Sequence, residues 1–283
     1  MQSKWIEDFV SPVTQEPLML SRAEGDGAEV KSGILANDDS RFEILGGIPR
    51  FVTSSYLTDD RESHSGDERT SRELQTAHSF GRLWRHESYM PKPDQSEAVR
   101  QSLSEQLEAM VGIPVRAESF DDLVEPGMKV LNAGCGTGWT ETLFKTPEAR
   151  RYAVDLSLAV ESAYEATREL DNTIVAQADI SALPFRDGFF DLIISNGVIH
   201  HTSDPSGNFA RLVNKLKPGG MIGIYVYRRK PYLRELADMA IRTKSTDMSF
   251  EDCQKFAAQM TALGESLAAI KEPLELSEDI PLL

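Results

Sequence analysis

Three closely spaced glycines follow an apolar stretch near the middle of the chain. Residues 129–133 are expected to form a buried strand, and Gly134, Gly136 and Gly138 come directly after it. Because glycine lacks a Cβ, such a loop lets bare backbone approach a ligand at the carboxyl end of the strand. A dinucleotide fingerprint would need its third glycine one place later, where this chain has Trp139. The spacing therefore favours a ligand-binding loop that is not of the dinucleotide type, with a plain strand–helix turn as the alternative.

Polar side chains end or follow the next three expected strands. The strands span residues 151–155, 173–178 and 190–196, and the polar residues are Asp155, Asp179 and Asn196. The carboxyl ends of parallel strands meet at one edge of a sheet, so these side chains should surround one crevice. Asp155 can accept two hydrogen bonds from ribose hydroxyls, and Asp179 can accept one from an adenine amino group. A single aspartate at a strand end is as often a solvated group or a helix cap, but polar residues at adjacent strand ends indicate a site.

The elements that position these residues alternate between strand and helix from Met128 onward, which is typical of a parallel sheet. The other expected elements are a helix from the glycine loop to about Thr146, a helix over 158–170, an amphipathic helix that ends at the turn 218–220, and a fifth strand over 221–227. The predicted fold class is therefore α/β, with a Rossmann-like, doubly wound and mainly parallel sheet. No clear strand pattern follows residue 227, so we expect five parallel strands, with the fifth at or near an edge.

Composition divides the chain into four regions: a small β-rich module at 1–55, a linker and helical cap at 56–125, the core at 126–230, and a helical segment at 231–283. In the first module, the expected strands are 30–34 and 41–45, and a turn at 46–49 closes the unit. The stretch from 57 to about 76 is polar and is expected to be a loop. The helices expected outside the core span 96–111, 232–241 and 250–270.

The charge of the chain restricts its partners. The formal net charge is −15, from 45 acidic and 30 basic residues, so a polyanion such as RNA would be repelled and a cationic ligand attracted. The basic run 228–230 is more typical of a solvated strand exit than of a nucleic-acid patch. No apolar run approaches the roughly 20 residues that span a bilayer, and the two cysteines, Cys135 and Cys253, do not suggest a disulfide framework. We therefore expect a cytoplasmic protein without nucleic-acid or membrane partners.

From about Gly127 to Tyr227 the chain resembles the class I S-adenosylmethionine-dependent methyltransferases. The resemblance rests on the strand and loop at 130–138, on Leu216-Lys217-Pro218-Gly219-Gly220, and on the pairs Pro184-Phe185 and Phe190-Asp191. It implies that the glycines line the methionine moiety of S-adenosylmethionine, that Asp155 holds the ribose, and that Asp179 with Ile180 holds the adenine. The full set of cofactor-binding residues that we expect is Asn132, Gly134, Cys135, Gly136, Gly138, Asp155, Leu156, Asp179, Ile180 and Asn196.

One residue departs from the pattern of that family. The family usually has an acid two places before the first glycine, where this chain has Asn132. Asparagine can still accept a hydrogen bond, but it lacks the charge that would complement the ammonium group of the cofactor. We therefore expect weakened binding rather than none. The chain also has Phe80-Gly81 and Trp84 in an aromatic segment that, in the resembling enzymes, precedes the cofactor pocket and can cover it. Core packing of Trp84 is the alternative.

The first module resembles the short zinc-ribbon-like unit that is often fused ahead of these enzymes. The resemblance rests on Ser11-Pro12-Val13-Thr14 and on the segments 35–39 and 47–52. In that unit two Cys-x-x-Cys pairs hold zinc. The corresponding positions here are Ser11, Thr14, Ala36 and Asp39, so we expect a degenerate module without a metal.

The expected reaction is methyl transfer to a small-molecule acceptor, through an oxygen, nitrogen or carbon nucleophile, by in-line displacement. His200 and His201 follow the fourth strand, and either one can serve as a base if the acceptor must lose a proton; shaping the loop is the alternative. Tyr225 and Tyr227 can face the acceptor. Two other functions stay open, namely methylation of tRNA or protein, and a non-catalytic S-adenosylmethionine-binding scaffold. We also expect a homodimer joined through the C-terminal helices, of which 250–270 should cover part of the acceptor side.

Overall fold

The computed structural model describes residues 1–25, 29–58, 68–85, 96–246 and 248–269. The chain forms two compact units, Met1–Tyr227 and Arg228–Leu283, and each is described by itself. The first unit contains all the residues that the sequence suggests for binding the cofactor and the acceptor. Its architecture therefore decides how the candidate site is built.

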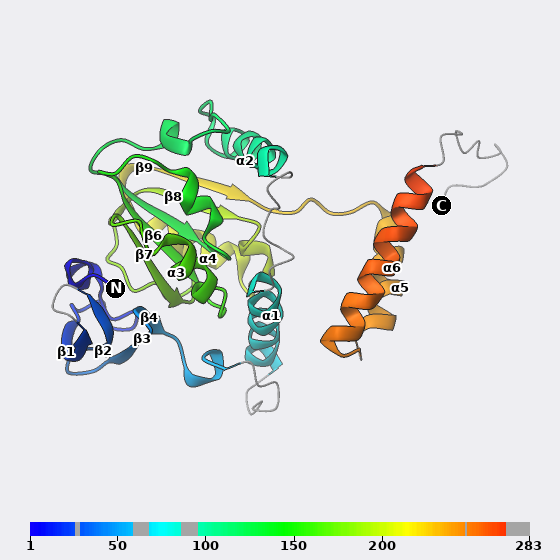
Figure 1. Ribbon diagram of the computed structural model, residues 1–283. Coiled ribbons are helices and arrows are strands. Elements are labelled where there is room, and N and C mark those ends of the chain that lie inside the picture. The colour runs from blue at the N-terminus through cyan, green and yellow to red at the C-terminus, as the bar shows by residue number, and fades with distance from the viewer. Residues whose placement is uncertain (26–28, 59–67, 86–95, 247, 270–283) are drawn as a thin grey trace. The chain divides into compact units, whose positions relative to one another are not determined.

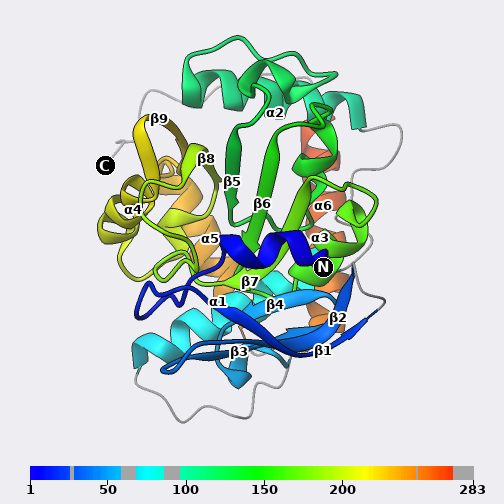
Figure 2. The same cartoon turned by 90° about the vertical axis from the view of Figure 1, so that its left-hand side faces the viewer.

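One nine-stranded sheet runs through the first unit in the order β1-β2-β3-β4-β7-β6-β5-β8-β9 (Figure 1). The strands are β1 (Met19–Gly25), β2 (Val30–Ala36), β3 (Arg41–Leu45), β4 (Ile48–Phe51), β5 (Lys129–Ala133), β6 (Arg150–Asp155), β7 (Thr173–Ala178), β8 (Phe190–Asn196) and β9 (Leu216–Tyr225). Figure 2 shows the N-terminal strands beside β7, on the side of the sheet away from β9. The predicted α/β fold with a mainly parallel sheet is confirmed, and β5, β7 and β8 have the predicted bounds.

The parallel part of the sheet has six strands, where five were expected. The additional strand is β4, which pairs in parallel with β7 through Arg50–Gln177 and Phe51–Ala178. Gly46 and Gly47, at φ +59° and +82°, form a two-residue hairpin turn from β3 into β4 instead of closing the module. β9 lies at an edge, as expected. The N-terminal module is therefore continuous with the core sheet.

Side chains of the first segment also share the hydrophobic core with the central strands. Trp5 meets Tyr152 edge to face, with ring centroids 5.4 Å apart, and Phe9 lies 5.5 Å from Phe185. The buried Asp8 accepts hydrogen bonds from Tyr152 Oη at 2.9 Å and from Arg150 Nη2 at 2.6 Å. Because Asp8 is buried, these two donors offset much of the cost of desolvating its carboxylate. These hydrogen bonds join the module to β6.

The helices of the first unit are α1 (Glu68–Arg85), α2 (Ser96–Val111), α3 (Val160–Thr167) and α4 (Pro205–Asn214). α2 has the predicted bounds, and it packs closely on β9, since a Cβ on Gly223 would lie 2.9 Å from Val111 Cγ1. The expectation of a loop from 57 to 76 is wrong from Glu68 onward, where α1 begins. The part of that stretch at 59–67 lies outside the described residues. The sequence did not predict α1 because the helix is polar and few apolar residues mark its buried face.

The helix expected after the glycine loop is also wrong, because the chain forms only a 3-10 helix over Trp139–Leu143. Thr140 and Thr142 are β-branched and favour a helix poorly, and Thr142 Oγ1 turns back to donate to Trp139 O at 2.6 Å. Two residues later, the N–H groups of Lys145 and Thr146 both donate to Asp121 Oδ1 at 2.7 Å. These contacts hold the chain away from a helical path.

The fifth core strand begins earlier than expected. β9 starts at Leu216, which pairs with Phe190, and it ends at Tyr225 rather than at Tyr227. The predicted turn 218–220 lies inside the strand as an irregularity, with Gly219 at φ +81°, and regular pairing resumes at Met221. α4 accordingly ends at Asn214, before this turn.

The described part of the second unit contains two helices, α5 (Tyr232–Ser245) and α6 (Phe250–Ala268), close to the two that the sequence predicts. The side chain of Ser249 accepts from the N–H of Asp252 and caps α6. None of the described helices has the length and apolarity that crossing a bilayer requires. The homodimer expected through these helices stays a prediction, which light scattering can test.

Candidate functional site

The glycine loop adopts backbone conformations that other residues rarely take. Gly134, Gly136 and Gly138 have φ values of +91°, +53° and +70°. The N–H of Gly134 donates to Val154 O at 2.7 Å, which ties the loop to β6. A Cβ on Gly134 would lie 2.2 Å from Val198 Cγ2, and one on Gly138 would lie 2.8 Å from the α carbon of Ala163 in α3. The first and third glycines are therefore required by close packing as well as by conformation.

Asp155 is joined directly to this loop. Its Oδ2 accepts the N–H of Gly136 at 2.9 Å, and its Oδ1 accepts both the N–H and the hydroxyl of Ser157, at 2.9 and 2.7 Å. The structure thus brings the predicted ribose-binding carboxylate to the middle glycine of the loop. Sequence analysis did not identify Ser157, which fixes the orientation of this carboxylate. The pattern Asp-x-Ser at a strand end is a signal that could have found it.

Asp179 and Ile180 lie at the end of β7, beside the N-terminal module. Asp179 Oδ1 accepts the N–H of Ser181 at 2.7 Å, and Ile180 is buried. Tyr56, the residue that follows the module, lies close by: burial, together with the charges of Glu73 and Asp179, raises its pKa to about 12. The phenol is therefore neutral and keeps its proton for hydrogen bonding. No sequence signal pointed to Tyr56.

Gln177 connects that module to the predicted cofactor site. Its Nε2 donates to Leu156 O at 2.9 Å and to Tyr56 O at 3.0 Å, and its Oε1 accepts Arg50 Nη1 at 2.9 Å. Leu156, which we expect to contact the cofactor, is thus held by a side chain from β7. One fully buried amide therefore links β4, β6 and β7.

α1 lies against the glycine loop. A Cβ placed on Gly136 would stand 3.8 Å from the indole of Trp84, an ordinary contact distance, so this ring lies close to the loop. The backbone of Gly81 comes close to the segment before α3, because a Cβ placed on Gly81 would lie 3.2 Å from the backbone nitrogen of Leu158. One turn before Trp84, Phe80 contacts His201, with ring centroids 5.1 Å apart. α1 therefore spans the distance from the glycine loop to the predicted histidines.

His200 and His201 lie in an aromatic cluster at the end of β8. The ring of His200 is 4.0 Å from His201 and 4.2 Å from Tyr227, and Tyr225 is 6.0 Å from Tyr227, all between ring centroids. Both ring nitrogens of His200 are buried and have no hydrogen-bond partner among the residues that the structure describes. Burial lowers the pKa of His200 and of His201, and His200 lowers that of His201 further. Both imidazoles are therefore held toward the neutral form.

Two further residues of the predicted set have partners that the sequence did not reveal. Asn196 Nδ2 donates to Gln106 Oε1 of α2 at 3.2 Å, and Asn132 Nδ2 donates to Glu141 Oε1 at 2.7 Å. Cys135 is buried, and burial raises the pKa of its thiol well above its usual value. The thiol of Cys135 is therefore a packing group and not a nucleophile.

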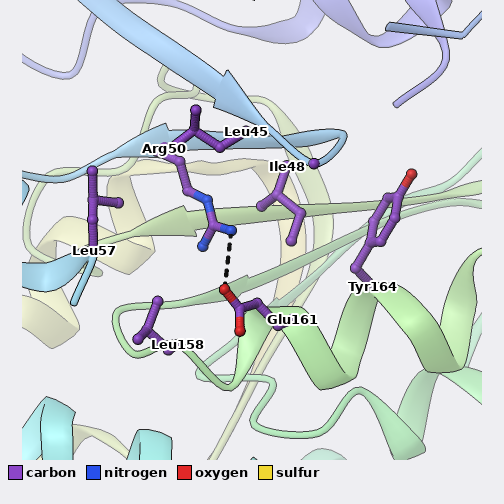
Figure 3. A pocket seen from close by; sticks show the side chains of 8 residues that line it. Leu45, Ile48, Arg50, Leu57, Leu158, Glu161 and Tyr164 are labelled. Atoms are coloured by element: carbon purple, nitrogen blue, oxygen red, sulfur yellow. Dashed lines mark ion pairs between the residues drawn. The ribbon is translucent and has the colours of Figure 1, made fainter. Parts of the chain in front are cut away.

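A separate cavity of about 410 Å³ lies between the N-terminal module and α3 (Figure 3). Its lining residues are Leu45, Gly46, Ile48, Arg50, Leu57, Leu158, Glu161 and Tyr164. Figure 3 shows the Arg50–Glu161 ion pair across it, with 3.6 Å between Nη2 and Oε1. Glu161 also lies 3.6 Å from Arg85 Nη1, so it connects β4, α3 and α1. None of the lining residues belongs to the expected cofactor-binding set.

Of the positions that correspond to zinc ligands in the zinc-ribbon-like unit, Ser11 and Thr14 flank one turn, Ala36 ends β2, and Asp39 lies in the turn that follows β2. Ser11 and Ser40 share a hydrogen bond of 2.7 Å between their hydroxyls, and Ser11 Oγ accepts the N–H of Thr14 at 3.2 Å. Hydroxyl contacts thus join the two turns. Both the likeness to a zinc ribbon and the expected absence of zinc stay predictions, which elemental analysis of the purified protein can test.

Comparison with known proteins identifies the central part of the chain. Residues 131–224 match the model of a family described as a methyltransferase domain. A malonyl-[acyl-carrier protein] O-methyltransferase from Erwinia billingiae is 36% identical over 96 residues, which cover 34% of this chain and 38% of that one. A ubiquinone/menaquinone biosynthesis C-methyltransferase from Shewanella piezotolerans is 27% identical over 163 residues, which cover 54% of this chain and 62% of that one. This chain thus spans less than two thirds of either relative.

A solved structure is also similar. Phosphoethanolamine N-methyltransferase 1 from Haemonchus contortus, in complex with phosphoethanolamine and S-adenosylhomocysteine, aligns with a TM-score of 0.41 and 18% identity over 58% of this chain and 34% of that one. Residues 131–224 thus match a methyltransferase domain, and the curated relatives that share this part of the chain are named as methyltransferases. The glycine loop fits the S-adenosylmethionine that the sequence resemblance implies, because it offers Cβ-free backbone and because Asp155 Oδ2 is held against it, 2.9 Å from the nitrogen of Gly136.

Proposed function

We propose that this protein transfers a methyl group from S-adenosylmethionine to a small-molecule acceptor. The observation that carries the proposal is the hydrogen bond of 2.9 Å between Asp155 and Gly136, because it unites the glycine loop and the ribose carboxylate in one site. When bound, S-adenosylmethionine would supply an electrophilic methyl group, whose bond to sulfur breaks as the acceptor nucleophile bonds to the methyl carbon, with S-adenosylhomocysteine as the leaving group. The chain's own contribution is then to bind, to orient and to exclude water.

In this proposal, the residues at the strand ends bind different parts of the cofactor. The loop from Gly134 to Gly138 holds the methionine moiety, Asp155 holds the ribose, and Asp179 with Ile180 holds the adenine. Trp84 excludes water from the loop, because its indole faces Gly136. Hydrogen bonds from the backbone and from Ser157 hold the Asp155 carboxylate before the cofactor arrives. Such preorganisation lowers the entropy that binding must remove.

The aromatic cluster at the end of β8 is the proposed acceptor side. His201, the more exposed of the two histidines, is held toward its neutral form, so a ring nitrogen can take a proton from an acceptor hydroxyl or amine. The ring of Tyr227 lies next to His200, and the ring of Tyr225 lies next to Tyr227. The two curated relatives described above are named for oxygen and carbon methylation, and both kinds of nucleophile stay within the proposal.

Replacing Asp155 tests the cofactor site. Asp155→Ala should lower the affinity for S-adenosylhomocysteine by about 10- to 100-fold, because a charge-assisted hydrogen bond contributes roughly 1.5–3 kcal/mol. Isothermal titration calorimetry measures this loss. Asp38→Ala, at an exposed turn of the N-terminal module, is the matched control and should bind normally. An unchanged affinity in Asp155→Ala would show that the ribose lies elsewhere.

Turnover separates an enzyme from a binding scaffold. The purified protein is incubated with S-adenosylmethionine labelled in its methyl group and with a small-molecule extract of cells. We expect label in a low-molecular-weight product and stoichiometric formation of S-adenosylhomocysteine. Label that enters only tRNA or protein would contradict the proposed acceptor class.

A further inference from the structure

Asn132 and Glu141 form a buried polar pair next to the glycine loop. Asn132 lies in β5, two residues before Gly134, and Glu141 lies in the 3-10 helix that follows the loop. Nδ2 of Asn132 donates to Oε1 of Glu141 over 2.7 Å. Glu141 is only 2% exposed. An acid buried this deeply reduces stability unless it is compensated, so its position calls for an explanation.

The contact fixes which end of the Asn132 side chain is available. A side-chain amide has a donor end, Nδ2, and an acceptor end, Oδ1. Glu141 occupies the donor end, so Oδ1 is turned away from Glu141. An ammonium group only donates hydrogen bonds, and an amide held in this orientation offers it an acceptor. Without Glu141, the amide could equally present its N–H₂ group and repel the ammonium.

We infer that Glu141 is a positioning residue for the ammonium group of the cofactor, and that it carries the negative charge which position 132 lacks. The inference rests on the proposed function. Glu141 holds Asn132 with Oδ1 toward the ammonium, and its charge attracts the ammonium through the protein interior, where screening is weak. The acid expected at residue 132 is thus supplied from a position nine residues further along the chain.

Two groups near Glu141 favour the charged form of its carboxylate. Burial raises the pKa of Glu141 above its usual value, and the hydrogen bond from Asn132 and the positive charge of Arg151 offset only part of that rise. Arg151 has its own fixed partners, which are Phe144 O, Asn172 Oδ1 and Thr173 Oγ1 at 2.7, 2.7 and 3.0 Å. The cation therefore stays in place whether or not Glu141 is present.

The pair also explains why the chain has asparagine at position 132. An aspartate there would place a second carboxylate within about 3 Å of Glu141 Oε1, and two carboxylates at such a distance do not both ionise. Asparagine satisfies Glu141 by donating to it. The departure from the family pattern and the buried acid are therefore two parts of one arrangement, not a loss of the binding function.

The test compares two ligands that differ in the group concerned. S-adenosylhomocysteine carries the ammonium and carboxylate of the cofactor, and 5′-methylthioadenosine lacks both. Their affinities are measured by calorimetry for the full chain and for Glu141→Gln, Asn132→Asp and the double variant. Glu165→Gln is the matched control, because Glu165 is an exposed acid of α3.

Glu141→Gln should bind S-adenosylhomocysteine about tenfold more weakly and 5′-methylthioadenosine unchanged. Asn132→Asp alone should lower the midpoint of thermal unfolding. The double variant should regain both stability and affinity, because the introduced glutamine can donate to the introduced aspartate, whose charge then meets the ammonium directly.

Each other outcome has a distinct meaning. Equal loss of both ligands in Glu141→Gln, or unchanged binding of S-adenosylhomocysteine, would overturn the positioning role. So would a double variant no better than Glu141→Gln. If the unmodified protein binds neither ligand, the proposed function itself fails, and the inference fails with it.

Discussion

Gly134 and Gly136 differ in how closely neighbouring side chains approach them. A Cβ on Gly134 would collide with Val198 at 2.2 Å, whereas one on Gly136 would meet Trp84 at an ordinary 3.8 Å. Gly134→Ala should therefore lower the free energy of unfolding by about 1–3 kcal/mol, through backbone strain at φ +91° and the clash. Gly136→Ala, at φ +53°, should lower it less. Urea denaturation measures both.

Removing the obstructing side chain gives the control for this prediction. Val198→Ala takes away both γ carbons that crowd Gly134, so the double variant with Gly134→Ala should regain part of the lost stability. The strain at positive φ would remain. A larger loss in Gly136→Ala than in Gly134→Ala would contradict the packing described here.

The stability of the protein should depend on pH through His200. Burial lowers its pKa in the folded state below the usual value of about 6.5, so the unfolded chain binds a proton more readily. Stability is therefore greatest above about pH 6.5 and falls as the pH drops from there through the folded pKa. His200→Phe should give a flatter profile over that window, measured as the thermal midpoint against pH.

His201 should also make the protein less stable at acidic pH, because burial and the charge of His200 lower its pKa as well. Part of the pH dependence should therefore survive in His200→Phe and be lost when His201→Phe is added. Identical slopes in the unmodified protein and in the double variant would show that the histidines are not held in the neutral form.

At the scale of elements, α1 should control how fast the cofactor leaves. Its Trp84 ring faces Gly136, and its Gly81 backbone rests near Leu158. Trp84→Ala should raise the dissociation rate of S-adenosylhomocysteine about tenfold, since a lost aromatic contact contributes roughly 0.5–1.5 kcal/mol beyond its burial. Stopped-flow displacement measures the rate.

Trp84→Phe keeps a ring of smaller size at the same place. It should therefore dissociate at a rate between those of the unmodified protein and Trp84→Ala. Equal rates for all three proteins would mean that Trp84 is core packing, which is the alternative that the sequence left open.

The elements that the sequence predicted well are those bounded by strong local signals. β5 ends just before Gly134, β7 ends just before Asp179, and both are short apolar runs buried within a parallel sheet. β1 was missed because nearly all of its side chains are exposed, so it shows no alternation. β4 was missed because it has only four residues, including Pro49, and pairs with a strand far along the chain.

The residues of the candidate site also fall into those that the sequence predicted and those that it did not. The glycines and Asp155 were found because a conformational or chemical requirement fixes their residue types, and the structure brings Gly136 and Asp155 together. Glu141 was not found, because its role depends on a side-chain contact across the glycine loop. The sequence there also suggested a helix, and the chain forms a 3-10 turn. Gln177 and Tyr56 were missed since their contacts join the N-terminal module to β7.

At the scale of the whole molecule, the N-terminal module and the methyltransferase core should unfold together. Asp8 joins them through Tyr152 and Arg150, and it is buried. Asp8→Ala leaves the Tyr152 hydroxyl without its acceptor and should lower the free energy of unfolding by about 1–3 kcal/mol. Tryptophan fluorescence, to which Trp5 of the module contributes, and far-ultraviolet circular dichroism should report one shared midpoint.

Glu7 gives a matched control, because it is the neighbouring acid and its side chain is 77% exposed. Glu7→Ala should leave the midpoint nearly unchanged. Two separate transitions in the unmodified protein would show that the module is an independent folding unit.

The pairing of β4 with β7 has a consequence for the chain during synthesis. Arg50 and its partner Gln177 are separated by 127 residues, so β4 leaves the ribosome well before β7 exists. At about 5–20 residues per second, this interval is on the order of 10 s. For that time β4 is an open edge on which another nascent chain could pair. Pro49, which has no N–H to donate, and the charged Arg50 are the residue types that discourage such pairing. The buried guanidinium that later reaches Gln177 thus also protects the unfinished protein from aggregation.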